Sequence, residues 1–133
     1  MNTELQLIED TAKILSKSGI SYVAYITSEL QPFSNQQRPD LVYTSSKHGT
    51  TFFIEYKPLR HNHIETSYIN SIEDRAQFVR SGLTEKNVTF ILAVDASLSN
   101  EDKIAVGSHG IKIIENVNSA QILADGINKN DNI

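Results

Sequence analysis

The chain has 133 residues, which is enough for one domain with a real hydrophobic core. It contains no cysteine, which excludes a disulfide framework, a thiolate zinc site and a cysteine nucleophile. Its 12 basic and 16 acidic residues give a net charge of -4, which argues against a protein that binds nucleic acid over most of its surface. We expect a single domain over residues 1–133.

The first part of the chain predicts a helix, a strand and a loop. Residues 3–18 carry apolar side chains at helical spacing, at Leu5, Ile8, Ala12 and Leu15. Gly19 stands in the position that a helix C-cap prefers. Residues 21–30 are rich in tyrosine, valine and isoleucine and predict a strand, whereas residues 31–39 contain two prolines and indicate a loop.

A β-hairpin is predicted next. Residues 40–46 and 50–57 are dense in β-branched and aromatic residues, which is typical of strands. We expect them to pair antiparallel around a tight turn whose central residues are Lys47 and His48. Pro58 ends the second strand, because proline has no N–H to donate to a neighbouring strand.

The second half of the chain alternates helices with strands. Residues 64–81 carry an apolar stripe at helical spacing, and the apolar run 88–96 is typical of a strand covered on both faces. Ser99 or Asn100 can cap a short helix that runs through about Val106. A strand at 111–115, a helix at 119–127 and a polar tail at 128–133 that we expect to fray follow. The order αβββαβαβα predicts a three-layer α/β/α domain with a central mixed sheet.

Two carboxylates and an amine are expected to meet at the end of the hairpin. Glu55 and Lys57 share one face of their strand, and the expected turn brings Asp40 opposite Glu55 on that face. Two carboxylates that close repel each other unless a cation lies between them, and paired oxygen donors suit Mg²⁺ or Mn²⁺. Lys57 can then orient an attacking water and stabilise developing negative charge. A register shift of one residue would move Asp40 to the other face.

These residues carry a resemblance to a known family. Pro39-Asp40, fourteen intervening residues and then Glu55-Tyr56-Lys57 resemble the motif of the PD-(D/E)XK nucleases, which have the restriction-endonuclease-like fold. The core of that family is a helix, a three-strand meander, a helix and a strand, as expected here over residues 3–96. The resemblance implies that Asp40 and Glu55 are metal ligands and that Lys57 is the catalytic lysine. The chain is similar in size to members of the Holliday-junction-resolvase type.

The resemblance also implies a further metal ligand on the first helix. Many members of the family place a glutamate there, and Glu9 is the candidate because it lies at the edge of the apolar stripe. Glu4 is the alternative. It is equally open at this point that Glu9 is only a solvated helix residue.

A locally basic stretch surrounds the proposed site. Residues 38–63 hold four basic and two acidic residues, a net charge of +2, so the rest of the chain carries -6. We expect Arg38, Lys47 and Arg60 to contact nucleic-acid phosphates. Chance clustering of these charges is the alternative.

The sequence therefore predicts a Mg²⁺-dependent phosphodiesterase, with Mn²⁺ as a substitute, that acts as an endonuclease on nucleic acid and on DNA in particular. The alternative is a catalytically silent domain of the same fold that binds nucleic acid or a protein. A homodimer fits because one such site cuts one strand, and a protein partner could supply DNA affinity. The sequence shows no secretory leader and no apolar stretch of membrane-spanning length, so a cytoplasmic location is expected.

Overall fold

A computed structural model describes residues 3–23, 40–59, 64–82 and 87–131, apart from the side chains of residues 75–82. Its helices and strands follow the predicted order. They are α1 (Thr3–Leu15), β1 (Gly19–Val23), β2 (Leu41–Ser45), β3 (Thr51–Lys57), α2 (Thr66–Gly82), β4 (Val88–Val94), α3 (Asn100–Gly107), β5 (Ile111–Ile114) and α4 (Ala120–Asp131). The predicted loop at 31–39 and the second part of the strand predicted at 21–30 lie outside the described residues.

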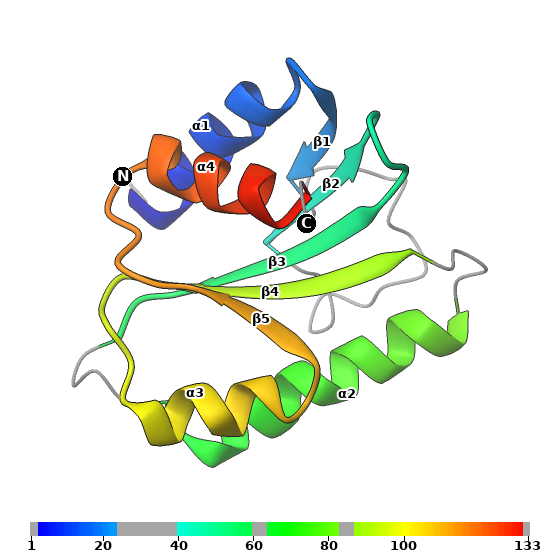
Figure 1. The fold of residues 1–133 in the computed structure, drawn as a ribbon. Coiled ribbons are helices and arrows are strands. Elements are labelled where there is room, and N and C mark those ends of the chain that lie inside the picture. The colour runs from blue at the N-terminus through cyan, green and yellow to red at the C-terminus, as the bar shows by residue number, and fades with distance from the viewer. Residues whose placement is uncertain (1–2, 24–39, 60–63, 83–86, 132–133) are drawn as a thin grey trace.

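The five strands form one open mixed sheet in the order β1-β2-β3-β4-β5. The first three strands are antiparallel neighbours, whereas β3, β4 and β5 run parallel to one another. Helices α1 and α4 lie on one side of the sheet and α2 and α3 on the other (Figure 1). The predicted α/β class with a mixed sheet is confirmed, and the arrangement is compatible with a three-layer α/β/α fold.

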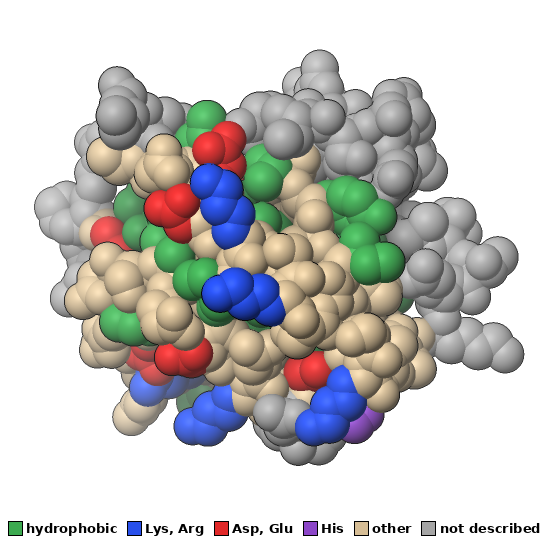
Figure 2. Space-filling model, turned by 90° about the horizontal axis from the view of Figure 1, so that it is seen from above, with side chains coloured by type: hydrophobic (Ala, Val, Ile, Leu, Met, Phe, Trp, Pro, Cys, Tyr) green, Lys and Arg blue, Asp and Glu red, His purple; other side chains and the backbone are tan. Residues whose placement is uncertain are grey.

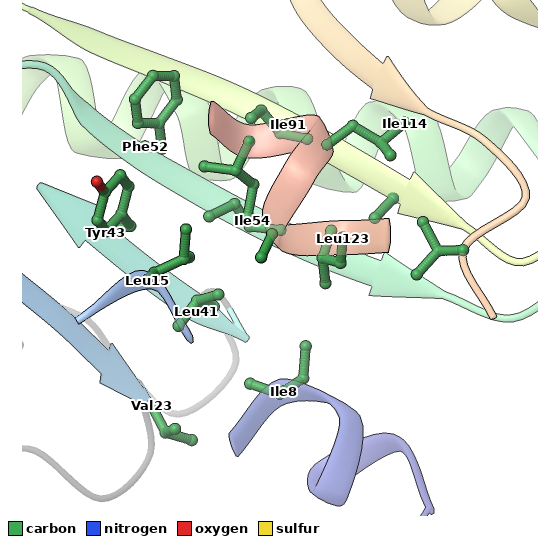
Figure 3. Close-up of a cluster of buried hydrophobic side chains, with 14 residues drawn as sticks. Ile8, Leu15, Val23, Leu41, Tyr43, Phe52, Ile54, Ile91, Ile114 and Leu123 are labelled. Atoms are coloured by element: carbon green, nitrogen blue, oxygen red, sulfur yellow. The ribbon is translucent and has the colours of Figure 1, made fainter. Parts of the chain in front are cut away.

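One hydrophobic cluster lies on each face of the sheet. On the side of α2 and α3, Val42 and Phe53 pack with Ile69 and Ile72. On the side of α1 and α4, the buried residues include Leu41, Tyr43, Phe52, Ile54, Ile91, Leu123 and Ile127 (Figure 3). Alternate residues of β3 therefore contribute to opposite layers, which fixes the face on which each side chain of that strand lies.

The hairpin has the predicted register. Leu41 pairs with Ile54 and Val42 pairs with Phe53, as a turn centred on Lys47 and His48 requires. Gly49 follows with a φ of 70°, a conformation that glycine adopts without the strain imposed by a Cβ atom. The strand pairing that brings Asp40 toward the end of β3 is thus confirmed up to Leu41.

Gly19 does not have the predicted role. Helix α1 ends at Leu15, and Gly19 is the first residue of β1 rather than a helix cap. A Cβ atom at this position would lie 2.5 Å from the carbonyl oxygen of Thr44 and 2.6 Å from Cε1 of Tyr43. Glycine is required here because the backbone of β1 passes directly against β2 and its buried tyrosine.

The fraying predicted for residues 128–133 is wrong for residues 128–131, and residues 132–133 lie outside the described part of the chain. Helix α4 continues to Asp131, because its last turn is attached to the hairpin. The hydroxyl of Ser45, which is buried, donates a 2.6 Å hydrogen bond to Oδ2 of Asp131. Sequence periodicity could not reveal this bond, since its partners lie 86 positions apart.

Of the two predicted caps of the short helix, the structure selects Ser99. Its hydroxyl oxygen accepts the backbone N–H of Asp102, which satisfies one of the free donors of the first turn of α3. The carboxylate of Asp102 is itself buried and accepts the N–H of Ile64, which attaches α3 to the segment before α2. Among the described residues no helix is long and apolar enough to span a membrane.

We predict that Gly19→Ala destabilises the fold by about 1–3 kcal/mol, because the added methyl group overlaps backbone and a buried ring. Gly107→Ala is the matched control, since a Cβ atom there meets nothing within 4 Å and lies at the end of a helix. That control should be neutral or stabilising by up to about 1 kcal/mol. Urea unfolding of both variants measures the difference. Equal stability of the two variants would contradict the close approach at Gly19.

Candidate functional site

Asp40 is held directly against the end of β3. Its carboxylate Oδ2 accepts the backbone N–H of Tyr56 at 2.8 Å, and its own N–H donates to the carbonyl of Ile54 at 3.1 Å. This second bond is offset by one residue from the regular pairing, so the ladder ends at Leu41. Because backbone N–H groups of a strand point within the sheet, the carboxylate lies beside the strand, between the positions of Glu55 and Lys57.

Glu55 and Lys57 lie on the face covered by α2. They alternate with Tyr56, which packs against the opposite cluster, and they follow Phe53 on the α2 side. Glu55 is half-buried and Lys57 is exposed. The predicted pairing of these two side chains on one face is therefore seen in the structure.

Tyr68, in the first turn of α2, contacts both of these side chains. Its hydroxyl donates a long hydrogen bond of 3.5 Å to Oε2 of Glu55. The amine Nζ of Lys57 lies 5.0 Å from the centre of its ring, within the range of a cation–π contact. A cavity of about 300 Å³ opens beside this group and is lined by Lys57, Leu59, Ile64, Glu65, Ser67 and Tyr68.

The structure does not bring the predicted helix glutamate to this group. Helix α1 packs on the face of the sheet opposite Glu55 (Figure 1), and Glu4 of this helix borders a cavity beside Tyr56. Among the residues that the structure describes, no three His, Cys, Asp or Glu side chains are arranged to hold a metal ion. A three-carboxylate site of Asp40, Glu55 and Glu9 is therefore not formed, and the group contains two carboxylates.

Of the three predicted phosphate contacts, the structure describes only Lys47, and it lies away from this group. Lys47 is exposed in the β2–β3 turn, at the opposite end of β3 from Lys57. At about 3.3 Å per residue the length of β3 separates them by roughly 20 Å. Arg38 and Arg60 lie outside the described residues, as do His61 and His63.

A second polar region lies on the other face of the sheet. A cavity of about 510 Å³ is bordered by Tyr56 and by three carboxylates, those of Glu4, Asp10 and Asp95. Burial raises the pKa of Tyr56 above its usual value, and the negative charges of Asp95 and Glu4 raise this pKa further. Asp95 also accepts the N–H of Leu59 at 2.8 Å, which holds the segment after β3.

Sequence reasoning did not identify Tyr68 or the role of Asp95. Tyr68 could have been found, because it lies four residues before Ile72 and therefore on the sheet-facing side of the predicted helix. Its partners on β3 depend on how α2 packs, which helix periodicity does not specify. The contact between Asp95 and Leu59 depends on the parallel pairing of β3 with β4 and has no local signal.

The group around Asp40 combines side chains of the kinds that could bind a metal ion and a phosphate. Its two carboxylates are hard oxygen donors of the kind that Mg²⁺ prefers, and an exposed ammonium lies on the same strand. The cavity beside Lys57 offers room for a ligand next to this ammonium. Around Tyr56, by contrast, the described residues that line the cavity include three carboxylates and no basic side chain.

We predict that Tyr56 ionises at a pH above the usual range of a tyrosine side chain, because its pKa is raised. Since its pKa is raised on folding, its contribution to stability is present below about pH 10 and is lost as the pH rises through the folded-state pKa. Absorbance at 295 nm should show a late phenolate transition that Tyr56→Phe removes and Asp95→Asn moves to lower pH. Asp125→Asn, at an exposed position on α4, is the control and should leave it unchanged. An unaltered transition in Asp95→Asn would contradict the charge effect.

Comparison of the chain with models of known protein families, with curated proteins and with solved structures found no match.

Proposed function

We propose that this chain is a divalent-metal-dependent nuclease, a DNA endonuclease in which Asp40 and Glu55 hold Mg²⁺ or Mn²⁺ beside Lys57. One observation carries the proposal. The Asp40 carboxylate accepts the N–H of Tyr56, the residue between Glu55 and Lys57. Residues from two strands that match the PD-(D/E)XK motif in sequence are thus adjacent in space.

The donor set suits the metal. Magnesium sites are commonly made of one or two carboxylates, with substrate phosphates and waters filling the other positions. When bound, the ion neutralises charge on a phosphate and lowers the pKa of a coordinated water. Two carboxylates, one before β2 and one at the end of β3, therefore fit Mg²⁺ without a ligand from α1.

The chain's own residues supply the remaining functions. The ammonium of Lys57 can donate hydrogen bonds to a phosphate oxygen and stabilise the negative charge that develops there. Its exposure leaves it accessible to a nucleic-acid backbone. The backbone N–H of Tyr56 fixes one oxygen of Asp40, so this carboxylate is oriented before any substrate arrives.

The charge distribution favours a local DNA contact. Among the described residues on the face formed by α1 and α4, acidic and basic side chains are interspersed and form no continuous basic surface (Figure 2). We therefore propose that DNA approaches the end of β3 from the α2 side and that Arg38 and Arg60, which flank the motif in sequence, contact its phosphates. One site cuts one strand, so cleavage of both strands requires two copies of the domain.

A catalytically silent binding domain is the second candidate, and one observation favours it. Among the described residues no three carboxylates at the end of β3 are arranged to hold a metal ion, and α1 lies on the other face of the sheet (Figure 1). A domain that had lost catalysis could keep this fold and use its surface to bind nucleic acid or a protein partner.

Nicking of supercoiled plasmid with Mg²⁺ or Mn²⁺ tests the proposal. We expect Lys57→Ala to lower the rate about 10²–10³-fold, as loss of a transition-state donor does. Asp40→Asn should also abolish most activity, although the asparagine oxygen can still accept the N–H of Tyr56. Nicking by the wild-type chain should depend on the metal.

Lys112→Ala and Asp125→Asn are the matched controls, since both residues are exposed and lie on β5 and α4. Both variants should retain wild-type nicking. Metal-dependent activity that survives Lys57→Ala would contradict the proposed role of the lysine. A wild-type chain that binds DNA but does not nick it would favour the silent domain.

A further inference from the structure

We propose that Tyr68 is a positioning residue that orients Glu55 and Lys57 together; this inference rests on the proposed nuclease function. Tyr68 is half-buried in the first turn of α2, and the segment before it is held by the hydrogen bond from Ile64 to the buried Asp102. The sequence motif does not include Tyr68. It comes from a different element and reaches both motif residues of β3 that face α2.

One tyrosine can contact both residues because of strand geometry. Glu55 and Lys57 are two positions apart on β3, so their attachment points are separated by roughly 7 Å along the strand. The hydroxyl of Tyr68 reaches Oε2 of Glu55, whereas its ring lies against Nζ of Lys57. The phenol therefore spans the two side chains, with its polar end at the carboxylate and its ring at the amine.

Each contact has a separate consequence. The hydroxyl donates to Oε2 of Glu55, which limits the rotation of this carboxylate and therefore the positions that its other oxygen can occupy. The negative face of the ring attracts the ammonium of Lys57, which restricts a long and flexible side chain. Partners that orient metal ligands in this way change metal affinity or activity by 10–100-fold when they are removed.

Two substitutions separate the contacts in the full-length chain. Tyr68→Phe keeps the ring and removes the hydroxyl, so Mn²⁺ affinity measured by calorimetric titration should fall about 10-fold or more. Tyr68→Leu removes the ring as well and should also lower kcat for plasmid nicking beyond the loss in Tyr68→Phe. Tyr43→Phe is the matched control, because it removes a tyrosine hydroxyl that contacts Ser18 on the other face of the sheet. The control should leave Mn²⁺ affinity unchanged.

A nuclear magnetic resonance measurement makes failure of this inference distinguishable from failure of the nuclease proposal. Ring-current shifts of the Lys57 side-chain protons should be present in the wild-type chain and in Tyr68→Phe, and absent in Tyr68→Leu. Active wild-type chain with unchanged Mn²⁺ affinity and kcat in both Tyr68 variants would overturn the positioning role alone. If the wild-type chain neither binds Mn²⁺ nor nicks DNA, the nuclease proposal is overturned. If the ring-current shift of Lys57 persists in that case, Tyr68 is only a structural contact, and the positioning role is overturned as well.

Discussion

The hydrogen bond from the N–H of Tyr56 to the carboxylate of Asp40 is the interaction on which the candidate site depends. It attaches the residue before β2 to the end of β3 at the point where the regular ladder stops. A carboxylate that accepts a backbone N–H has a fixed position that a free side chain at a strand end would lack. Together with the bond from the N–H of Asp40 to the carbonyl of Ile54, the bond from Tyr56 holds Asp40 beside the end of β3.

The sheet divides the polar residues of β3 between two environments. Glu55 and Lys57 lie with Tyr68 on the α2 side, whereas Tyr56 lies among carboxylates on the α1 side. The strand is buried along its first four residues and becomes accessible only at its end, where these side chains occur. The buried part of β3 thus fixes the face of the sheet on which each polar side chain at the end of the strand lies.

Most of the fold could be predicted from local patterns, because each element carries its own periodicity and the hairpin register follows from its turn. The adjacency of Asp40 to Glu55 and Lys57 was predictable for the same reason. The contacts of Tyr68, the bond between Ser45 and Asp131 and the packing of α1 on the face opposite Glu55 could not be predicted in this way. These depend on which face each helix covers, and an apolar stripe predicts that a helix packs without stating against which side of the sheet.

Titration with Mn²⁺, followed by paramagnetic broadening of the nuclear magnetic resonance spectrum, tests most directly whether Asp40 and Glu55 form a metal site. If they do, we expect broadening centred on residues 40 and 55–57 at low Mn²⁺ concentration, and we expect this broadening to be lost in Asp40→Asn and in Glu55→Gln. Broadening centred instead on Glu4, Asp10 and Asp95, or none at all below saturating metal, would contradict the proposed metal site.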